Sequence, residues 1–165
     1  MADDTHGTAE AAPRLWAKGR RWEDFTVGER FEHHWGRTLW HADNALFSTT
    51  TLSWLPLHLN EAYAREQGHE TVTLHPLLLF CTVLGMSVED LSESGGAFLG
   101  VDDLRFARPA YPGTTVRARS TVLSKRASGS RPTQGIVTWR TEGVDQDGRL
   151  LLEFERTNLI LRRDG

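Results

Sequence analysis

Hydrophobic and polar positions divide the chain into a polar beginning, a middle of short helical segments and a second half of strands. The longest apolar run, residues 76–88, carries hydrophobic side chains on nearly every face of a helix, which is typical of a helix surrounded by protein. Pro76 suits the first helical position, because its missing N–H would have no partner inside the helix. A helix of this kind must be covered by other parts of the protein, and we expect the later segments to cover it as strands of a sheet.

Four segments in the second half have the apolar content and the bounding turn residues of strands. They are residues 97–105, 114–125, 135–144 and 149–161. Asp147-Gly148 predicts a tight hairpin between the last two. The apolar positions of the last strand change face between Phe154 and Leu159, so we predict a β-bulge near Arg156.

The first half predicts one strand and two short helices. The strand is expected over residues 30–39, and the helices over 44–53 and 61–67. Asp43 precedes the first helix, where the helix dipole favours an acid, and Pro56 is expected to end it. Asn60 is predicted to cap the second helix. This order of elements indicates an α+β domain in which an antiparallel sheet curls around one central helix.

Composition narrows the class of protein. The 165 residues fit one domain, and we expect a disordered tail over 1–20 and a folded domain over 21–165. A net charge of −3 gives no basic patch for nucleic acid, and no apolar run is long enough for a membrane span. The N-terminus lacks a basic region followed by an apolar core. The single cysteine, Cys81, excludes an internal disulfide and favours a cytoplasmic location.

Two histidines flank the start of the apolar helix in an informative pattern. His58 lies in a tight turn, Leu55–Asn60, and a short polar helix separates it from His75, which directly precedes Pro76. The pattern predicts a titratable side chain close to the N-terminus of a buried helix. That placement suits a site that polarises a carbonyl group and moves a proton beside it.

Several short motifs resemble one family. They are Phe25–Gly28, His41–Asp43, Pro56–Asn60, Leu104–Pro109 and Pro112–Thr114. With them, the stretch from Phe25 to Arg162 resembles a MaoC-like hydratase/dehydratase of the hotdog fold, closest in style to the mesaconyl and methylmalyl branched-acyl members. The resemblance implies reversible addition of water to a 2-enoyl thioester carried on coenzyme A or an acyl carrier protein.

The resemblance also implies roles for particular residues. In the family, an Asp five residues before the His works with it on one water molecule; here the His is His58 and the Asp position holds Ser53. A Gly that opens the buried helix donates its N–H to the thioester oxygen in the family, but Pro76 occupies that position and has no N–H. We therefore expect His58 to be the main acid/base, with Leu77 or Leu78 as the amide donor.

Other side chains could have either a role in the site or an ordinary structural role. Asp43 could supply an acid or only start a helix, and His75 could face the site or cap a turn. Trp54 could narrow the acyl pocket or pack against a partner. The side chains that could bind coenzyme A phosphates, or be ordinary surface charges, are Arg105, Arg126 and Arg131.

These observations predict a cytoplasmic hydratase/dehydratase with an acyl-CoA or acyl-carrier-protein substrate and no metal or cofactor. An exposed sheet edge and a small core predict a homodimer or a higher homo-oligomer. The changes at Ser53 and Pro76 keep two alternatives open. One is an acyl thioesterase or a tailoring enzyme of secondary metabolism on the same fold, and the other is a non-catalytic acyl-thioester-binding subunit of a heteromer.

Overall fold

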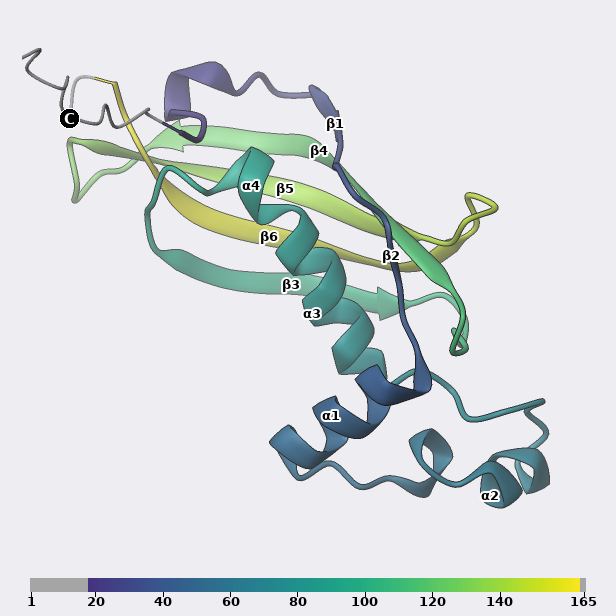
Figure 1. Ribbon diagram of the computed structural model, residues 1–165. Coiled ribbons are helices and arrows are strands. Elements are labelled where there is room, and N and C mark those ends of the chain that lie inside the picture. The colour runs from purple at the N-terminus through teal and green to yellow at the C-terminus, as the bar shows by residue number, and fades with distance from the viewer. Residues whose placement is uncertain (1–17, 164–165) are drawn as a thin grey trace, which may run out of the picture.

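The computed structural model describes residues 18–163, in which one antiparallel sheet holds a central helix against one of its faces (Figure 1). The helical elements are η1 (Trp22–Asp24), α1 (His41–Thr51), η2 (Pro56–His58), α2 (Glu61–Glu66), α3 (Pro76–Met86) and α4 (Val88–Leu91). The strands are β1 (Arg30–Glu32), β2 (Arg37–Thr38), β3 (Phe98–Phe106), β4 (Thr115–Ala127), β5 (Gln134–Val144) and β6 (Leu150–Leu161). These elements confirm the α+β class and the four predicted long strands.

The sheet runs in the order β1-β4-β5-β6-β3, and β2 adds a second short pairing to β4. Strands β4, β5 and β6 are joined by hairpins, and β3 pairs with β6 at the far edge. The β5–β6 turn confirms the predicted hairpin, because Gly148 has a positive φ of 79° and donates its N–H to the Asp145 carbonyl. The β3 edge has no further strand beside it within the described residues.

Helix α3 packs closely against the middle of the sheet. Leu79 and Val83 are its fully buried residues, and a Cβ added to Gly143 of β5 would meet Val83 Cγ2 at 2.6 Å. A glycine is therefore needed where the helix crosses the strand. Leu77 and Cys81 on the other side of α3 are exposed, so the sheet covers one face of this apolar helix within the chain.

The predicted strand over residues 30–39 is wrong in its continuity. It breaks after Glu32 and resumes at Arg37, since Trp35 adopts a positive φ of 60° that a strand does not allow. Inside the break, His33 turns its ring into the protein. Tertiary contacts of His33 thus interrupt a segment that local alternation alone would extend.

The first long helix also begins and ends earlier than predicted. It starts at His41 and stops at Thr51, because Leu52 adopts the left-handed conformation with φ 57° and donates its N–H to Ser48 O and Thr49 O. Pro56 therefore does not end this helix. In contrast, Asn60 caps α2 as predicted, with its side-chain oxygen accepting the Tyr63 N–H.

The predicted bulge near Arg156 is wrong. Pairing between β5 and β6 is unbroken from Leu152 to Leu161. The register shifts that flank Arg156 occur in the pairing with β3, and the extra residues lie on β3, between Phe98 and Gly100 and between Asp102 and Arg105. Arg156 keeps the inward direction of Phe154 and is only 1% exposed, with its guanidinium over the ring of Trp139. Burial lowers the pKa of Arg156 to about 10. The change of face in the apolar pattern of β6 therefore comes from a buried polar residue, Arg156, and not from a residue inserted into this strand.

Two predictions concern parts that the structure covers incompletely. Residues 1–17 of the predicted tail lie outside the described residues, and at residue 20 the Arg20 carbonyl already accepts a hydrogen bond from Ser94 Oγ. Within residues 18–163, no helix is long and apolar enough to cross a membrane.

Candidate active site

One buried side chain, Asn44 of α1, joins the segments that carry the candidate site. It is 1% exposed. Its Nδ2 donates to the His58 carbonyl at 3.2 Å and to the Thr73 carbonyl at 2.8 Å, while its Oδ1 accepts the His75 N–H at 2.9 Å. The amide therefore fixes η2 and the approach to α3 relative to each other.

The hydrogen bonds of His58 determine its tautomer. Its Nδ1 lies 3.1 Å from Thr73 O and 3.0 Å from Thr73 Oγ1. A carbonyl oxygen can only accept, so Nδ1 carries the proton and Nε2 of the neutral ring has a free lone pair. Burial lowers the pKa of His58 below its ordinary value of 6.5, and the weaker effect of the Thr73 hydrogen bond opposes it. His58 is therefore a neutral base near pH 7.

His75 and Ser53 form a second pair beside His58. The Leu77 N–H donates to His75 Nδ1 at 3.1 Å, so the proton of the neutral His75 ring lies on Nε2. That Nε2–H donates to Ser53 Oγ at 2.9 Å. Burial, together with the nearby His58, lowers the pKa of His75 and keeps the ring neutral. The hydroxyl proton of Ser53 is consequently left for another acceptor.

The end of α1 and the aromatic rings around it position this pair. The left-handed Leu52 reverses the chain, and Ser53 N–H then donates to Ser48 O at 3.0 Å. The His75 ring lies between Phe47 and His58, with centroid separations of 4.9 and 4.7 Å. The structure thus brings the predicted residues Ser53, His58 and His75 together.

The first turn of α3 offers one free amide donor near these rings. Pro76 has no N–H, and that of Leu77 is already engaged by His75 Nδ1. The Leu79 N–H donates to His75 O at 3.1 Å. The Leu78 N–H has no acceptor among residues 18–163. Of the two predicted amide donors, the structure leaves Leu78 available and occupies Leu77.

A cavity of about 430 Å³ opens beside His58. Its volume lies in the range of small-molecule sites. Most of its wall is apolar, and the residues that line it are Leu57, His58, His69, Thr73, Leu74, Pro76, Leu79, Phe106, Ala107, Arg108, Pro109 and Ala110.

The three predicted supporting residues, Asp43, His75 and Trp54, are absent from the wall of this cavity, and so is Ser53, which lies against His75. Asp43 accepts the Trp40 N–H at 2.7 Å and a hydrogen bond from Arg37 at 2.5 Å, so its carboxylate caps α1. Trp54 is 64% exposed and is absent from the cavity wall. Asp43 therefore has the structural role, and Trp54 does not narrow the cavity within this chain.

The predicted phosphate-binding arginines lie elsewhere. Arg105 points to solvent on β3 and pairs with Asp103 at 3.5 Å. Arg126 and Arg131 lie at the β4–β5 turn, at the end of the sheet opposite to α1 and α2 (Figure 1). Arg126 is eleven residues along β4 from Thr115, which is about 36 Å at roughly 3.3 Å per residue. The structure does not bring these three residues to the cavity.

A second polar cluster, which the sequence did not indicate, lies under the sheet. His33 Nδ1 is 2.7 Å from Asp90 Oδ2, and His33 Nε2 is 2.8 Å from Ser120 Oγ. This order of groups is that of a serine-hydrolase triad, but Ser120 is buried in the sheet and its Oγ also contacts Thr141 Oγ1 at 2.8 Å. We interpret the cluster as a link between the broken first strand, α4 and β4. Within the described residues, no group of three His, Cys, Asp or Glu side chains could hold a metal ion.

Sequence reasoning missed four residues of the site: Asn44, His69, Thr73 and Arg108. An asparagine in a helix interior is a weak signal, because its side chain favours caps and turns unless it has another partner. Thr73 and Arg108 carry no local signal, since their partners are distant in sequence.

Comparisons with known proteins point to one family. The mesaconyl-CoA hydratase family model matches residues 4–165. Mesaconyl-CoA hydratase of Haloarcula hispanica is 43% identical over 148 residues, which cover 89% of this chain and 41% of that protein. The chain thus spans about two fifths of the length of the curated relatives it matches.

Solved structures agree. A protein of Chloroflexus aurantiacus J-10-fl described as a MaoC domain dehydratase has a TM-score of 0.86 and 30% identity, covering 92% of this chain and 43% of that one. A Mycobacterium tuberculosis protein with a double hotdog fold has a TM-score of 0.79 and 26% identity, covering 90% of this chain and 46% of that one. These likenesses confirm the predicted hotdog fold.

We predict that Asn44→Asp lowers the free energy of unfolding by on the order of 3 kcal/mol, because it points a carboxylate oxygen at two buried carbonyls. Urea unfolding measures the change. Asn60→Asp is the matched control, since Asn and Asp cap helices about equally well and its stability should change little. Equal losses for the two variants would contradict the central role of Asn44.

Proposed function

The chain belongs to the mesaconyl-CoA hydratase family, and on that basis we propose that it adds water across the C2–C3 bond of a short branched acyl-CoA, or removes water in the reverse direction. The observation that carries the proposal is the free Nε2 of a neutral, buried His58 in an apolar cavity beside the start of α3. A base, a hydrophobic acyl site and an unengaged helix N–H are the parts that this reaction needs.

In hydration, His58 Nε2 takes a proton from water, and the water oxygen forms a bond to C3. The electron pair of the double bond moves toward the thioester, and the Leu78 N–H stabilises the enolate oxygen. His58 then returns its proton to C2, so one base serves both proton transfers. Dehydration is the same sequence in reverse. Acid–base assistance of this kind contributes about 10²–10⁴-fold.

Ser53 takes over the water-holding part of the role that a carboxylate has in the family. Because His75 donates to Ser53 Oγ, the Ser53 hydroxyl can direct its own proton to the oxygen of the water or of the product hydroxyl. Ser53 cannot act as a base at neutral pH, so proton transfer falls to His58. His75 acts through Ser53 and is a positioning residue.

The same hydrogen bonds argue against a serine thioesterase. A nucleophilic Ser53 would need an adjacent base for its proton. His75 Nε2 is already protonated and donates to Ser53, because Nδ1 accepts from Leu77. His58 Nε2 is therefore the available base, and it suits activation of water.

We also propose that the chain pairs with a second copy through β3. This edge strand exposes Leu99 and Phe106 and has no neighbour on one side. The Mycobacterium tuberculosis neighbour holds two hotdog folds in a chain of which this one covers 46%. A second copy of this chain would take the place of the second hotdog domain that the Mycobacterium tuberculosis protein carries in one chain.

His58→Ala should lower kcat for hydration of mesaconyl-CoA by about 10²–10⁴-fold, because it removes the base. The assay follows loss of the conjugated thioester absorbance over a panel of enoyl-CoA substrates. His34→Ala, at an exposed histidine outside the cavity, is the control and should keep wild-type rates. Equal rates for His58→Ala and wild type would remove His58 from the mechanism. Release of free thiol with an intact double bond would favour the thioesterase, and tight binding without turnover would favour a non-catalytic subunit.

The pH profile of kcat/KM should be level near neutrality and fall in acid, with a midpoint below the ordinary histidine pKa of 6.5, because protonation of His58 removes the base. Ser53→Ala should lower the rate but keep this midpoint. The lowered pKa values of His33, His58 and His75 also mean that stability is complete above about pH 6.5 and declines as pH falls. Melting curves in each buffer separate that decline from loss of the base. A midpoint clearly above 6.5 would contradict the assignment.

Leu99→Glu should convert the proposed dimer to a monomer, since it places a charge in the apolar part of the proposed interface. Sedimentation velocity measures the mass. Val27→Glu, at an exposed apolar position next to the opposite sheet edge, is the control and should leave the dimer intact. A wild-type protein that sediments as a monomer at micromolar concentration would contradict the pairing.

A further inference from the structure

The cavity wall holds two polar side chains that the proposed reaction does not use. His58 and Thr73 contact each other, and the other polar side chains of the wall are His69 and Arg108. Both lie among apolar residues such as Leu74 and Phe106. In small-molecule sites, a few polar groups in an apolar wall set the orientation and the specificity of the ligand.

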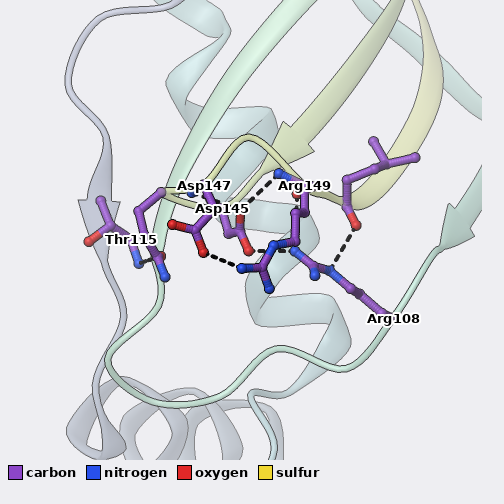
Figure 2. Close-up of polar contacts among 7 residues, drawn as sticks. Arg108, Thr115, Asp145, Asp147 and Arg149 are labelled. Atoms are coloured by element: carbon purple, nitrogen blue, oxygen red, sulfur yellow. Dashed lines mark hydrogen bonds and ion pairs between the residues drawn. The ribbon is translucent and has the colours of Figure 1, made fainter.

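Arg108 is fixed along one side of its guanidinium (Figure 2). Its Nε donates to Leu150 O at 3.1 Å, and its Nη2 donates to Asp145 Oδ2 at 2.5 Å and to Arg149 O at 3.3 Å. Asp145 is in turn held by the N–H groups of Asp147 and Arg149, which both donate to its Oδ1. These contacts hold the guanidinium rigidly, and Nη1 has no acceptor among the described residues.

His69 is fixed in a similar way on the facing segment. Its backbone N–H donates to Ala64 O at 3.0 Å at the end of α2. Its Nδ1 lies 3.0 Å from the hydroxyl of Tyr111, and its Nε2 has no partner within residues 18–163. Two anchored residues of the cavity wall therefore each keep one side-chain nitrogen without a partner among the described residues.

We propose that Arg108 and His69 form a subsite for a carboxylate at the far end of the acyl chain, which selects monothioesters of dicarboxylic acids over plain acyl thioesters. The inference rests on the proposed function and deepens it. The mesaconyl group named for the relatives carries such a carboxylate. A carboxylate that enters an apolar cavity loses its water and needs donors in exchange, and an arginine nitrogen is well suited to that role.

A phosphate of coenzyme A is the other oxyanion that could reach Arg108. The pantetheine arm, however, holds the phosphates well away from the thioester, whereas Arg108 lines the same cavity as His58. An acyl carboxylate lies only a few bonds from the reacting carbons. The shared cavity therefore favours the carboxylate.

Binding of unreactive, saturated thioesters tests the subsite independently of turnover. The ligands are methylsuccinyl-CoA and 2-methylbutyryl-CoA, which differ by a carboxylate in place of a methyl group, and calorimetry measures Kd. The wild type should bind methylsuccinyl-CoA about 10–100-fold more tightly, as expected for hydrogen bonds to a charged group. Arg108→Gln should remove most of that preference and leave 2-methylbutyryl-CoA binding within about threefold of the wild-type value.

Arg149→Gln is the matched control, because Arg149 pairs with Asp147 in the same turn but does not line the His58 cavity. It should keep the wild-type preference. His69→Gln should reduce the preference in part, and it tests the subsite separately if Arg108→Gln unfolds the turn.

Three outcomes would overturn the inference. The first is a wild type that binds both thioesters equally. The second is an equal loss for both in Arg108→Gln that disappears with the corresponding pantetheine thioesters, which would assign Arg108 to a coenzyme A phosphate. The third is an equal loss with all four ligands, which would assign it a structural role. A preserved preference in a protein without hydratase activity would instead reject the proposed function and leave the subsite standing.

Discussion

The candidate site depends on the side-chain amide of Asn44. The residues it joins belong to α1, η2 and the segment that enters α3, and none of them lies in the sheet, whose ladder could have fixed them. The amide satisfies two buried carbonyls and one buried N–H. Thr73 O accepts from both Asn44 Nδ2 and His58 Nδ1, so the group that holds the loop also determines the tautomer of His58. The position of this loop and the tautomer of His58 therefore both depend on the Thr73 carbonyl.

The changes from the family pattern form one linked set. Pro76 removes an amide donor from the start of α3, and His75 Nδ1 then occupies the Leu77 N–H. That hydrogen bond places the His75 proton on Nε2, where it serves Ser53, the residue that stands where a carboxylate was expected. A carboxylate at position 53 would pull His75 toward the charged form beside His58. The neutral serine adds no such charge, which fits the single base of the proposed mechanism.

Local signals predicted the parts of the fold that local chemistry decides. The Asn60 cap and the Gly148 hairpin were correct because each depends on neighbours within a few residues. The break at Trp35 and the inward Arg156 depend on tertiary contacts, so alternation along the strand could not show them. The same division holds in the site. The family resemblance indicated His58 and Ser53, whereas Arg108 meets its partner Asp145 only through the folded β5–β6 turn.

The sheet edge proposed for pairing also forms part of the cavity wall, so pairing would change the surroundings of the candidate site. Phe106, the last residue of β3, lines the cavity and is still 41% exposed, so part of the cavity wall lies open at the edge proposed for pairing. A second copy along β3 would cover that ring and remove water from the wall around His58. Electrostatic interactions strengthen as water leaves, including those of the Leu78 N–H with an enolate oxygen and of Arg108 with a carboxylate. On this argument the isolated chain carries the groups of the proposed site, and pairing through β3 would give them the dry surroundings in which they act most strongly.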